Sequence, residues 1–294
     1  MTYCVSMLLD SGLVFLSDSR TSAGVDQINT FRKTTVFEIP GERVIVMLSA
    51  GNLAITQGVL NLLAGNLAAQ DPHTASLHGC PNMFEAARCI GDALRQMHTR
   101  DGEALKAQGV EFNATFIVGG QIKGEPPRLF SIYSAGNFIE ASPDTTYFQI
   151  GESKYGKPII DRVITPGTSL DEASKCALIS MDSTLRSNIS VGLPLDLLVY
   201  EEGALRVSKF VRIDHHNHYM QMIRGTWGER LKQVFQEIPD PTWRDAPAGS
   251  SAPRLETEIS QPPRAPLPPA LEGETPLAAP MQLVAQSASG TAPR

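Results

Sequence analysis

Threonine follows the initiator methionine of this chain, and that position can give it two reactive groups. Initiator methionine is normally removed when the next residue is small. Removal of Met1 would leave Thr2 with a hydroxyl nucleophile and a free α-amine. An α-amine has a reference pKa of about 7.7–8.0, so much of it is neutral near physiological pH and can accept a proton. Because a threonine can use its own amine as the base, Thr2 is a candidate nucleophile if a site forms around it.

A hairpin at the start of the chain is predicted to bring an acid back to Thr2. Residues 3–9 and 13–19 have the composition of two short strands, and Asp10-Ser11-Gly12 between them favours a turn. Because the first strand begins at the N-terminus, Asp18 near the end of the second strand should lie beside Thr2.

Two further strands are expected over residues 33–39 and 43–49. Lys33 opens the first of them, and Ser49-Ala50-Gly51 ends the second before a run with helical spacing. A lysine–aspartate pair on a surface contributes little. Lys33 and Asp18 therefore gain significance only from a fold that places them with Thr2.

The order of these motifs resembles that of proteasome β-type subunits, which are N-terminal nucleophile hydrolases. The opening Met1-Thr2-Tyr3-Cys4, without a propeptide, and the segment from Asp18 to Lys33 are most similar to Anbu, the bacterial ancestral β-subunit group. The resemblance covers residues 2–238 and rests on the order and spacing of four short motifs: Thr2, Ser17-Asp18-Ser19-Arg20, Arg32-Lys33 and Ser49-Ala50-Gly51.

The resemblance implies roles for the matching residues. Thr2 would be the nucleophile and its amine the proton acceptor. Lys33 would stabilise the alkoxide, and Asp18 would hold Lys33 protonated and oriented. The N–H of Gly51 would donate to the oxyanion, where one preorganised donor is worth about 2.7–4 kcal/mol. Substrate binding would involve two further positions, Ser49 at the base of the pocket and Arg20.

Two turns depart from the family pattern. Where the family has Gly-Ser-Gly, this chain has Gly151-Glu152-Ser153, so either Glu152 replaces the serine near the amine or Ser153 substitutes for it. After a long helix, Ser187 stands where an aspartate is expected, and Ser190 matches the final serine. Asp182, one helical turn earlier, could compensate if its side chain reaches inward. These serines could equally be ordinary turn or capping residues.

The remaining pattern indicates an α+β fold, and the resemblance implies a four-layer αββα sandwich. The pattern alone predicts only mixed α and β structure. Further strands are expected over 113–119, 128–134, 147–150, 195–200 and 205–213, and helices over 52–69, 82–99, 170–186 and 227–236.

The composition changes after Ile238. Twelve of the 21 prolines lie from Pro239 onward. Such a segment cannot bury enough apolar surface to offset its ordering entropy. We predict a proteasome β-like hydrolase domain over residues 1–238 and a disordered, Pro/Ala-rich tail over 239–294. The tail could be an inert extension or could contact other subunits or partners.

Charge and hydropathy narrow the class of protein. The formal net charge is −6 and no basic stripe is present, which argues against a nucleic-acid partner. No apolar run approaches the roughly 20 residues of a membrane span, and no secretory signal is evident. The four cysteines lack paired spacing and suit reduced thiols. We expect a cytoplasmic protein with no membrane partner.

A histidine cluster near the end of the domain invites a metal interpretation. On a strand, Asp214, His216 and His218 would share one face, with His215 on the other. The cluster lies at a predicted strand end, where polar residues are common, so we expect neither a metal nor another cofactor. The histidines could instead make a subunit contact whose strength depends on pH.

These observations predict a threonine peptidase that cleaves peptide bonds through an acyl-enzyme at Thr2. Its substrates would be peptides or unfolded proteins. The resemblance implies a ring or spiral homo-oligomer, and because no nucleotide-binding motif is present, unfolding energy would come from a partner such as an ATP-dependent unfoldase. The alternatives are a weakly active or inactive scaffold subunit, favoured by the departures at Glu152 and Ser187, and an amidase for small amides or isopeptides.

Overall fold

The computed structural model describes residues 2–23, 27–68 and 76–241. The chain divides into two compact units, Met1–Pro239 and Asp240–Arg294. The predicted tail over 239–294 falls almost wholly outside the described residues, so its disorder stays a prediction.

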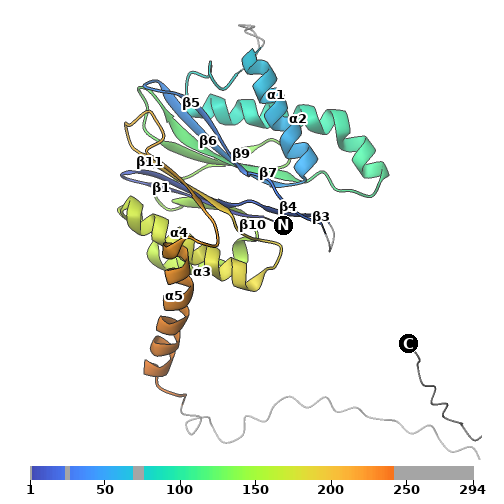
Figure 1. Ribbon diagram of the computed structural model, residues 1–294. Coiled ribbons are helices and arrows are strands. Elements are labelled where there is room, and N and C mark those ends of the chain that lie inside the picture. Colours follow the sequence, from blue (N-terminus) through green and yellow to red (C-terminus); the bar gives the residue numbers. More distant parts are fainter. Residues whose placement is uncertain (1, 24–26, 69–75, 242–294) are drawn as a thin grey trace, which may run out of the picture. The chain divides into compact units, whose positions relative to one another are not determined.

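A five-stranded antiparallel sheet contains the N-terminal strand, and its order is β10-β1-β2-β11-β12 (Figure 1). The predicted N-terminal hairpin is confirmed, because Cys4 pairs with Ser17 and Leu9 pairs with Gly12. The strands of this sheet are β1 (Tyr3–Leu9), β2 (Gly12–Asp18), β10 (Tyr147–Gly151), β11 (Leu195–Glu201) and β12 (Lys209–Ile213).

A second five-stranded antiparallel sheet follows the chain order β5-β6-β7-β8-β9. A two-stranded ribbon, β3 (Arg20–Ala23) and β4 (Gln27–Thr30), precedes it in the chain. The strands of the second sheet are β5 (Thr34–Ile39), β6 (Arg43–Gly51), β7 (Ala114–Ile122), β8 (Arg128–Ile132) and β9 (Phe138–Glu140).

Helices cover the outer face of each sheet, which gives the predicted four-layer αββα sandwich (Figure 1). One apolar core joins the second sheet to its helices, another joins the first sheet to its helices, and a third fills the space between the sheets. The helices are α1 (Leu53–Ala68) and α2 (Met83–Ala107) on the second sheet, and α3 (Lys157–Val163), α4 (Leu170–Ser187) and α5 (His218–Glu237) on the first.

Three predicted boundaries were wrong. The helix expected over 82–99 continues to Ala107 as α2. The other two boundaries differ for local reasons. The strand expected from residue 205 begins only at Lys209, because Leu205 adopts a φ of 46° and its N–H donates to the Tyr200 hydroxyl over 3.2 Å. The last helix begins at His218 instead of residue 227, because the side chain of Asn217 accepts the N–H of Met220 and caps the helix there. The short elements β3, β4, β9 and α3 were not predicted.

Candidate active site

A buried ion pair lies at the end of β2. Asp18 is the last residue of that strand, and Lys33 directly precedes β5. The Nζ of Lys33 lies 2.6 Å from Oδ1 of Asp18 and also donates to the carbonyl oxygen of Arg20 over 2.7 Å. Both side chains of the pair are almost fully buried. The fold therefore holds the amine of Lys33 in one place.

The same carboxylate connects this pair to Thr2. The N–H of Tyr3 donates to Oδ1 of Asp18 over 3.0 Å, and this nitrogen is bonded directly to the carbonyl carbon of Thr2. Lys33 and the backbone beside Thr2 thus share one oxygen atom. Burial raises the pKa of Asp18, an effect that the Lys33 ammonium and the N–H groups of Tyr3 and Gly192 oppose. Thr2 is itself buried.

The end of β6 lies on the other side of Lys33. The N–H of Ser49 donates to the carbonyl oxygen of Lys33 over 3.0 Å, so the Ser49-Ala50-Gly51 strand end is fixed next to the lysine backbone. Gly51 has a φ of 109°, and a Cβ there would lie 2.3 Å from the carbonyl oxygen of Asn113. Only glycine fits this position without strain.

The Gly151-Glu152 turn contacts Thr2 through the backbone. The N–H of Glu152 donates to the carbonyl oxygen of Thr2 over 2.7 Å. Gly151 has a φ of 83°, and a Cβ there would lie 1.9 Å from that same oxygen. The carboxylate of Glu152 lies 3.9 Å from the Nζ of Lys154. The structure therefore places Glu152 beside Thr2 by its backbone.

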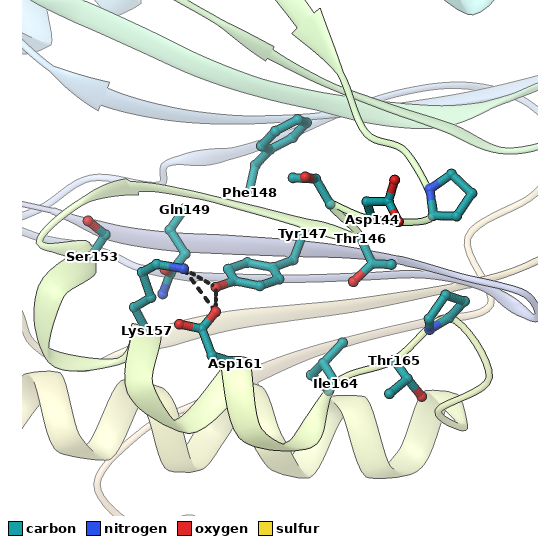
Figure 2. A pocket seen from close by; sticks show the side chains of 13 residues that line it. Asp144, Thr146, Tyr147, Phe148, Gln149, Ser153, Lys157, Asp161, Ile164 and Thr165 are labelled. Carbon is teal, nitrogen blue, oxygen red and sulfur yellow. Dashed lines mark hydrogen bonds and ion pairs between the residues drawn. The ribbon is translucent and has the colours of Figure 1, made fainter.

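Ser153 lies one residue farther on, at the start of a 3-10 turn that spans Ser153–Tyr155. Figure 2 shows it at one end of a groove that also contains Tyr147, Lys157 and Asp161. Within the described residues, the Ser153 side chain makes no hydrogen bond to Thr2, so its substitution for the family's serine stays a prediction.

The turn after α4 binds the other oxygen of Asp18. The N–H of Gly192 donates to Oδ2 of Asp18 over 3.3 Å. The guanidinium of Arg20 donates to the carbonyl oxygen of Ile189 over 2.9 Å, and a Cβ at Gly192 would lie 2.1 Å from the Nε of Arg20, so a side chain there would require Arg20 to move. Arg20 therefore fastens this turn to the ion pair.

The serines of this turn are placed differently from one another. The hydroxyl and N–H of Ser190 both donate to Oδ1 of Asn188, over 2.5 and 3.0 Å, which forms a local turn. Ser187 is the last residue of α4 and is exposed. Asp182 does not reach the site, because its two oxygens accept from Arg186 and Arg224, over 3.0 and 3.1 Å. The suggested compensation by Asp182 was wrong.

Solved structures with this fold identify the family. Anbu from Yersinia bercovieri is 53% identical over 82% of this chain and 100% of its own, with a TM-score of 0.76. Anbu from Hyphomicrobium sp. strain MC1 is 48% identical over 81% of this chain and 99% of its own, with a TM-score of 0.76. The chain belongs to the Anbu family.

Two other comparisons extend this result. The structure of a helical assembly of the Anbu complex from Pseudomonas aeruginosa is 47% identical over 83% of this chain and all of its own, with a TM-score of 0.78. A curated proteasome subunit beta from Haloquadratum walsbyi is 23% identical over 147 residues, which span 50% of this chain and 58% of that relative. No protein-family model matches the chain. This Anbu chain is thus related to proteasome β subunits.

Sequence reasoning missed the backbone groups that hold Asp18 and Lys33 in this Anbu site. The N–H groups of Tyr3 and Gly192 orient Asp18, and the carbonyl of Arg20 holds Lys33. A backbone group leaves no residue-type signature. Gly192 nevertheless closes a turn that the resemblance had already marked, and its lack of a side chain beside Arg20 was the available signal.

The histidine cluster does not share a strand face. β12 ends at Ile213, and the Asp214 side chain accepts the N–H of His216 over 2.8 Å in the turn before α5. The strand arrangement considered for a metal was therefore wrong. In the described ranges, no three His, Cys, Asp or Glu side chains are grouped so that they could hold a metal ion.

The cysteines and the helices add two observations. All four cysteines of this Anbu chain are buried and none forms a disulfide within the described residues, and burial raises the pKa of the Cys4 thiol beyond the ordinary cysteine range. Among residues 2–23, 27–68 and 76–241, no helix has the length and apolar character needed to cross a bilayer.

Proposed function

We propose that this Anbu protein is a threonine peptidase in which Thr2, freed by removal of Met1, attacks peptide bonds. The observation that carries the proposal is the Asp18 carboxylate oxygen shared by the Lys33 ammonium and the N–H that follows Thr2. This arrangement keeps a buried positive charge near the nucleophile and a negative charge behind it. Burial strengthens the electrostatic effect of both.

The reaction follows from these groups. The α-amine of Thr2 accepts the hydroxyl proton, and the oxygen attacks the carbonyl carbon of the scissile amide. The Lys33 ammonium stabilises the alkoxide, and the N–H of Gly51 donates to the tetrahedral oxyanion. The ammonium of Thr2 then returns its proton to the leaving amine. Water hydrolyses the resulting ester and restores Thr2.

The wider context belongs to the same proposal. Peptides or unfolded proteins are the substrates, Ser49 lies at the base of the pocket for the residue before the cleaved bond, and Arg20 supports the site through the turn it fastens. The protein acts in the cytoplasm as a homo-oligomer, and a separate unfoldase could supply extended chains. Support for self-association comes from the helical assembly of the Pseudomonas aeruginosa Anbu complex.

Reaction with a peptide epoxyketone tests the nucleophile. This warhead forms a ring with both the hydroxyl and the amine of an N-terminal threonine. We expect the intact mass of the protein to show loss of Met1 and one covalent adduct, and we expect Thr2→Ala to form none. Retention of Met1, or undiminished peptide hydrolysis by Thr2→Ala, would contradict the proposal.

A non-catalytic assembly subunit is the second candidate. Two observations favour it. Ser187 is exposed where the family has an aspartate, and the Asp182 carboxylate forms ion pairs with two arginines. Removal of Met1 without adduct formation, tested with several peptide epoxyketones, would support this function. Turnover of small amides but not of long peptides would instead indicate an amidase.

A further inference from the structure

One edge of strand β10 leads to Thr2. Among the strands of the described residues, β10 is outermost in its sheet and pairs only with β1, so its other edge is unpaired there. The N–H of Leu8 donates to the carbonyl of Thr146, and the N–H of Glu152 donates to that of Thr2. In an antiparallel ladder the bonded residues alternate, so the even-numbered residues of β10 face β1. The N–H and C=O groups of Tyr147, Gln149 and Gly151 therefore point away from the sheet.

A groove of about 550 Å³ runs beside this edge. Strand β10 forms one wall, with Thr146 to Gln149, and Lys157, Asp161 and Ile164 lie opposite (Figure 2). The Nζ of Lys157 donates to the hydroxyl of Tyr147 over 2.7 Å and to Asp161 over 2.8 Å, and that hydroxyl also bonds to Asp161. This network holds the Tyr147 ring in place, so the groove is preformed.

The character of the groove favours an extended polypeptide over a permanent subunit contact. An unpaired strand edge is a template for another strand, and β10 (Tyr-Phe-Gln-Ile-Gly) contains no charge or proline to block pairing. Most lining side chains are polar or charged, among them Asp144, Thr165 and Ser153. Obligate subunit interfaces are more apolar.

The position of the groove also fits a substrate. Tyr147 and Glu152 are five residues apart, and a strand advances about 3.3 Å per residue, so Tyr147 lies about 17 Å along the strand from Glu152, whose backbone contacts Thr2. The lining of the groove extends from Pro143 to Ser153, the residue next to Glu152. A chain paired with β10 therefore runs along the strand that ends at the nucleophile.

We propose that the β10 edge and its groove bind an extended segment of a polypeptide substrate as a sixth strand and hold it a few residues from Thr2. The identity of the ligand as substrate rests on the proposed function. The bound backbone pairs with Tyr147, Gln149 and Gly151, so recognition depends little on side-chain sequence. This contact increases the binding affinity of long chains, but not that of peptides too short to reach the groove.

Two substitutions at one residue isolate the backbone contact. Gln149→Pro removes an N–H that points away from β1, whereas Gln149→Ala keeps that N–H and loses the same side-chain bond to Tyr3. Both are made in the full chain carrying Thr2→Ala, so that no cleavage occurs. The probe is fluorescein-labelled, reduced and carboxymethylated α-lactalbumin, an unfolded protein. We expect fluorescence anisotropy to show about tenfold weaker binding for the proline variant than for the alanine variant.

The outcomes separate this proposal from the proposed function. Equal binding of the probe by the two variants would overturn the edge site. If the mass of the assembly also differs between the variants, the edge is a contact between copies of the chain. The epoxyketone adduct is measured separately in both variants with Thr2 intact. If the adduct forms but the two variants bind the probe equally, the peptidase proposal stands and the edge site is excluded. If no adduct forms but the proline variant binds the probe more weakly, the edge site stands and the peptidase proposal is excluded.

If the Gln149→Pro variant does not fold, a second measurement tests the edge site. Peptides N-methylated at alternate residues are tested against the otherwise unmodified Thr2→Ala chain. We expect methylation in one register to weaken binding and methylation in the other register to leave it unchanged, because only every second N–H of an added strand faces β10. Equal effects in both registers would overturn the proposal.

Discussion

At the scale of single residues, the ion pair between Lys33 and Asp18 links stability to chemistry. The exposed fractions of the two side chains are 8% and 0%, so neither charge is solvated if the other is removed. We expect Lys33→Met to lower the free energy of unfolding by about 3–5 kcal/mol, because it leaves a buried unpaired carboxylate. It should also abolish the epoxyketone adduct.

The double variant Lys33→Met/Asp18→Asn provides the control for this loss. Asparagine removes the unpaired charge and keeps an oxygen for the N–H of Tyr3, so most of the stability should return while the adduct stays absent. Urea unfolding and intact mass measure the two effects. Adduct formation by Lys33→Met at the unmodified rate would show that Lys33 does not activate Thr2.

Residue types predicted this part of the site better than its surroundings. Thr2 and Asp18 could be grouped because a hairpin that starts at the N-terminus returns its second strand to the first residue, whereas the resemblance implied the place of Lys33. The places of Ser153 and Asp182 could not be foreseen, because they depend on which neighbour each side chain meets. Ser153 faces a groove made by α3, an element that was not predicted, and Asp182 meets an arginine of α5.

At the scale of elements, Asp182 joins two helices. Its side chain is 1% exposed and accepts from Arg186 of the same helix and Arg224 of α5. Only Met220 and Ile223 of α5 are buried, so the apolar contact of that helix is small. We expect Asp182→Ala to speed amide hydrogen exchange across α5 while the rate of epoxyketone labelling stays the same.

Glu229→Ala is the matched control for this helix, because Glu229 is exposed and pairs only with Lys232 in the described part of the chain. It should leave exchange in α5 nearly unchanged. Slower labelling in Asp182→Ala, with unchanged exchange in α5, would instead place Asp182 in the active-site machinery.

At the scale of the whole molecule, the layers were more predictable than the strand order. Strands such as β6 are buried along almost their whole length and give continuous apolar runs, which show a core strand but not its neighbours. The pairing of β1 with β10 joins residues Tyr3 and Gly151, and no local pattern specifies a contact so distant in sequence. That pairing, however, brings the Gly151-Glu152 turn to Thr2.

Truncation after Pro241 tests whether this layered unit suffices for folding and assembly. The three apolar cores of the described residues lie within Met1–Pro239. The residues beyond Pro241 carry 10 of the chain's 21 prolines and little that could form a core. We expect the truncated and full chains to share a thermal unfolding midpoint, an adduct yield and a subunit number by native mass spectrometry. A lower midpoint with the same subunit number would mean that residues beyond Pro241 stabilise the subunit itself. A smaller assembly of equally stable subunits would mean that they connect one copy to the next.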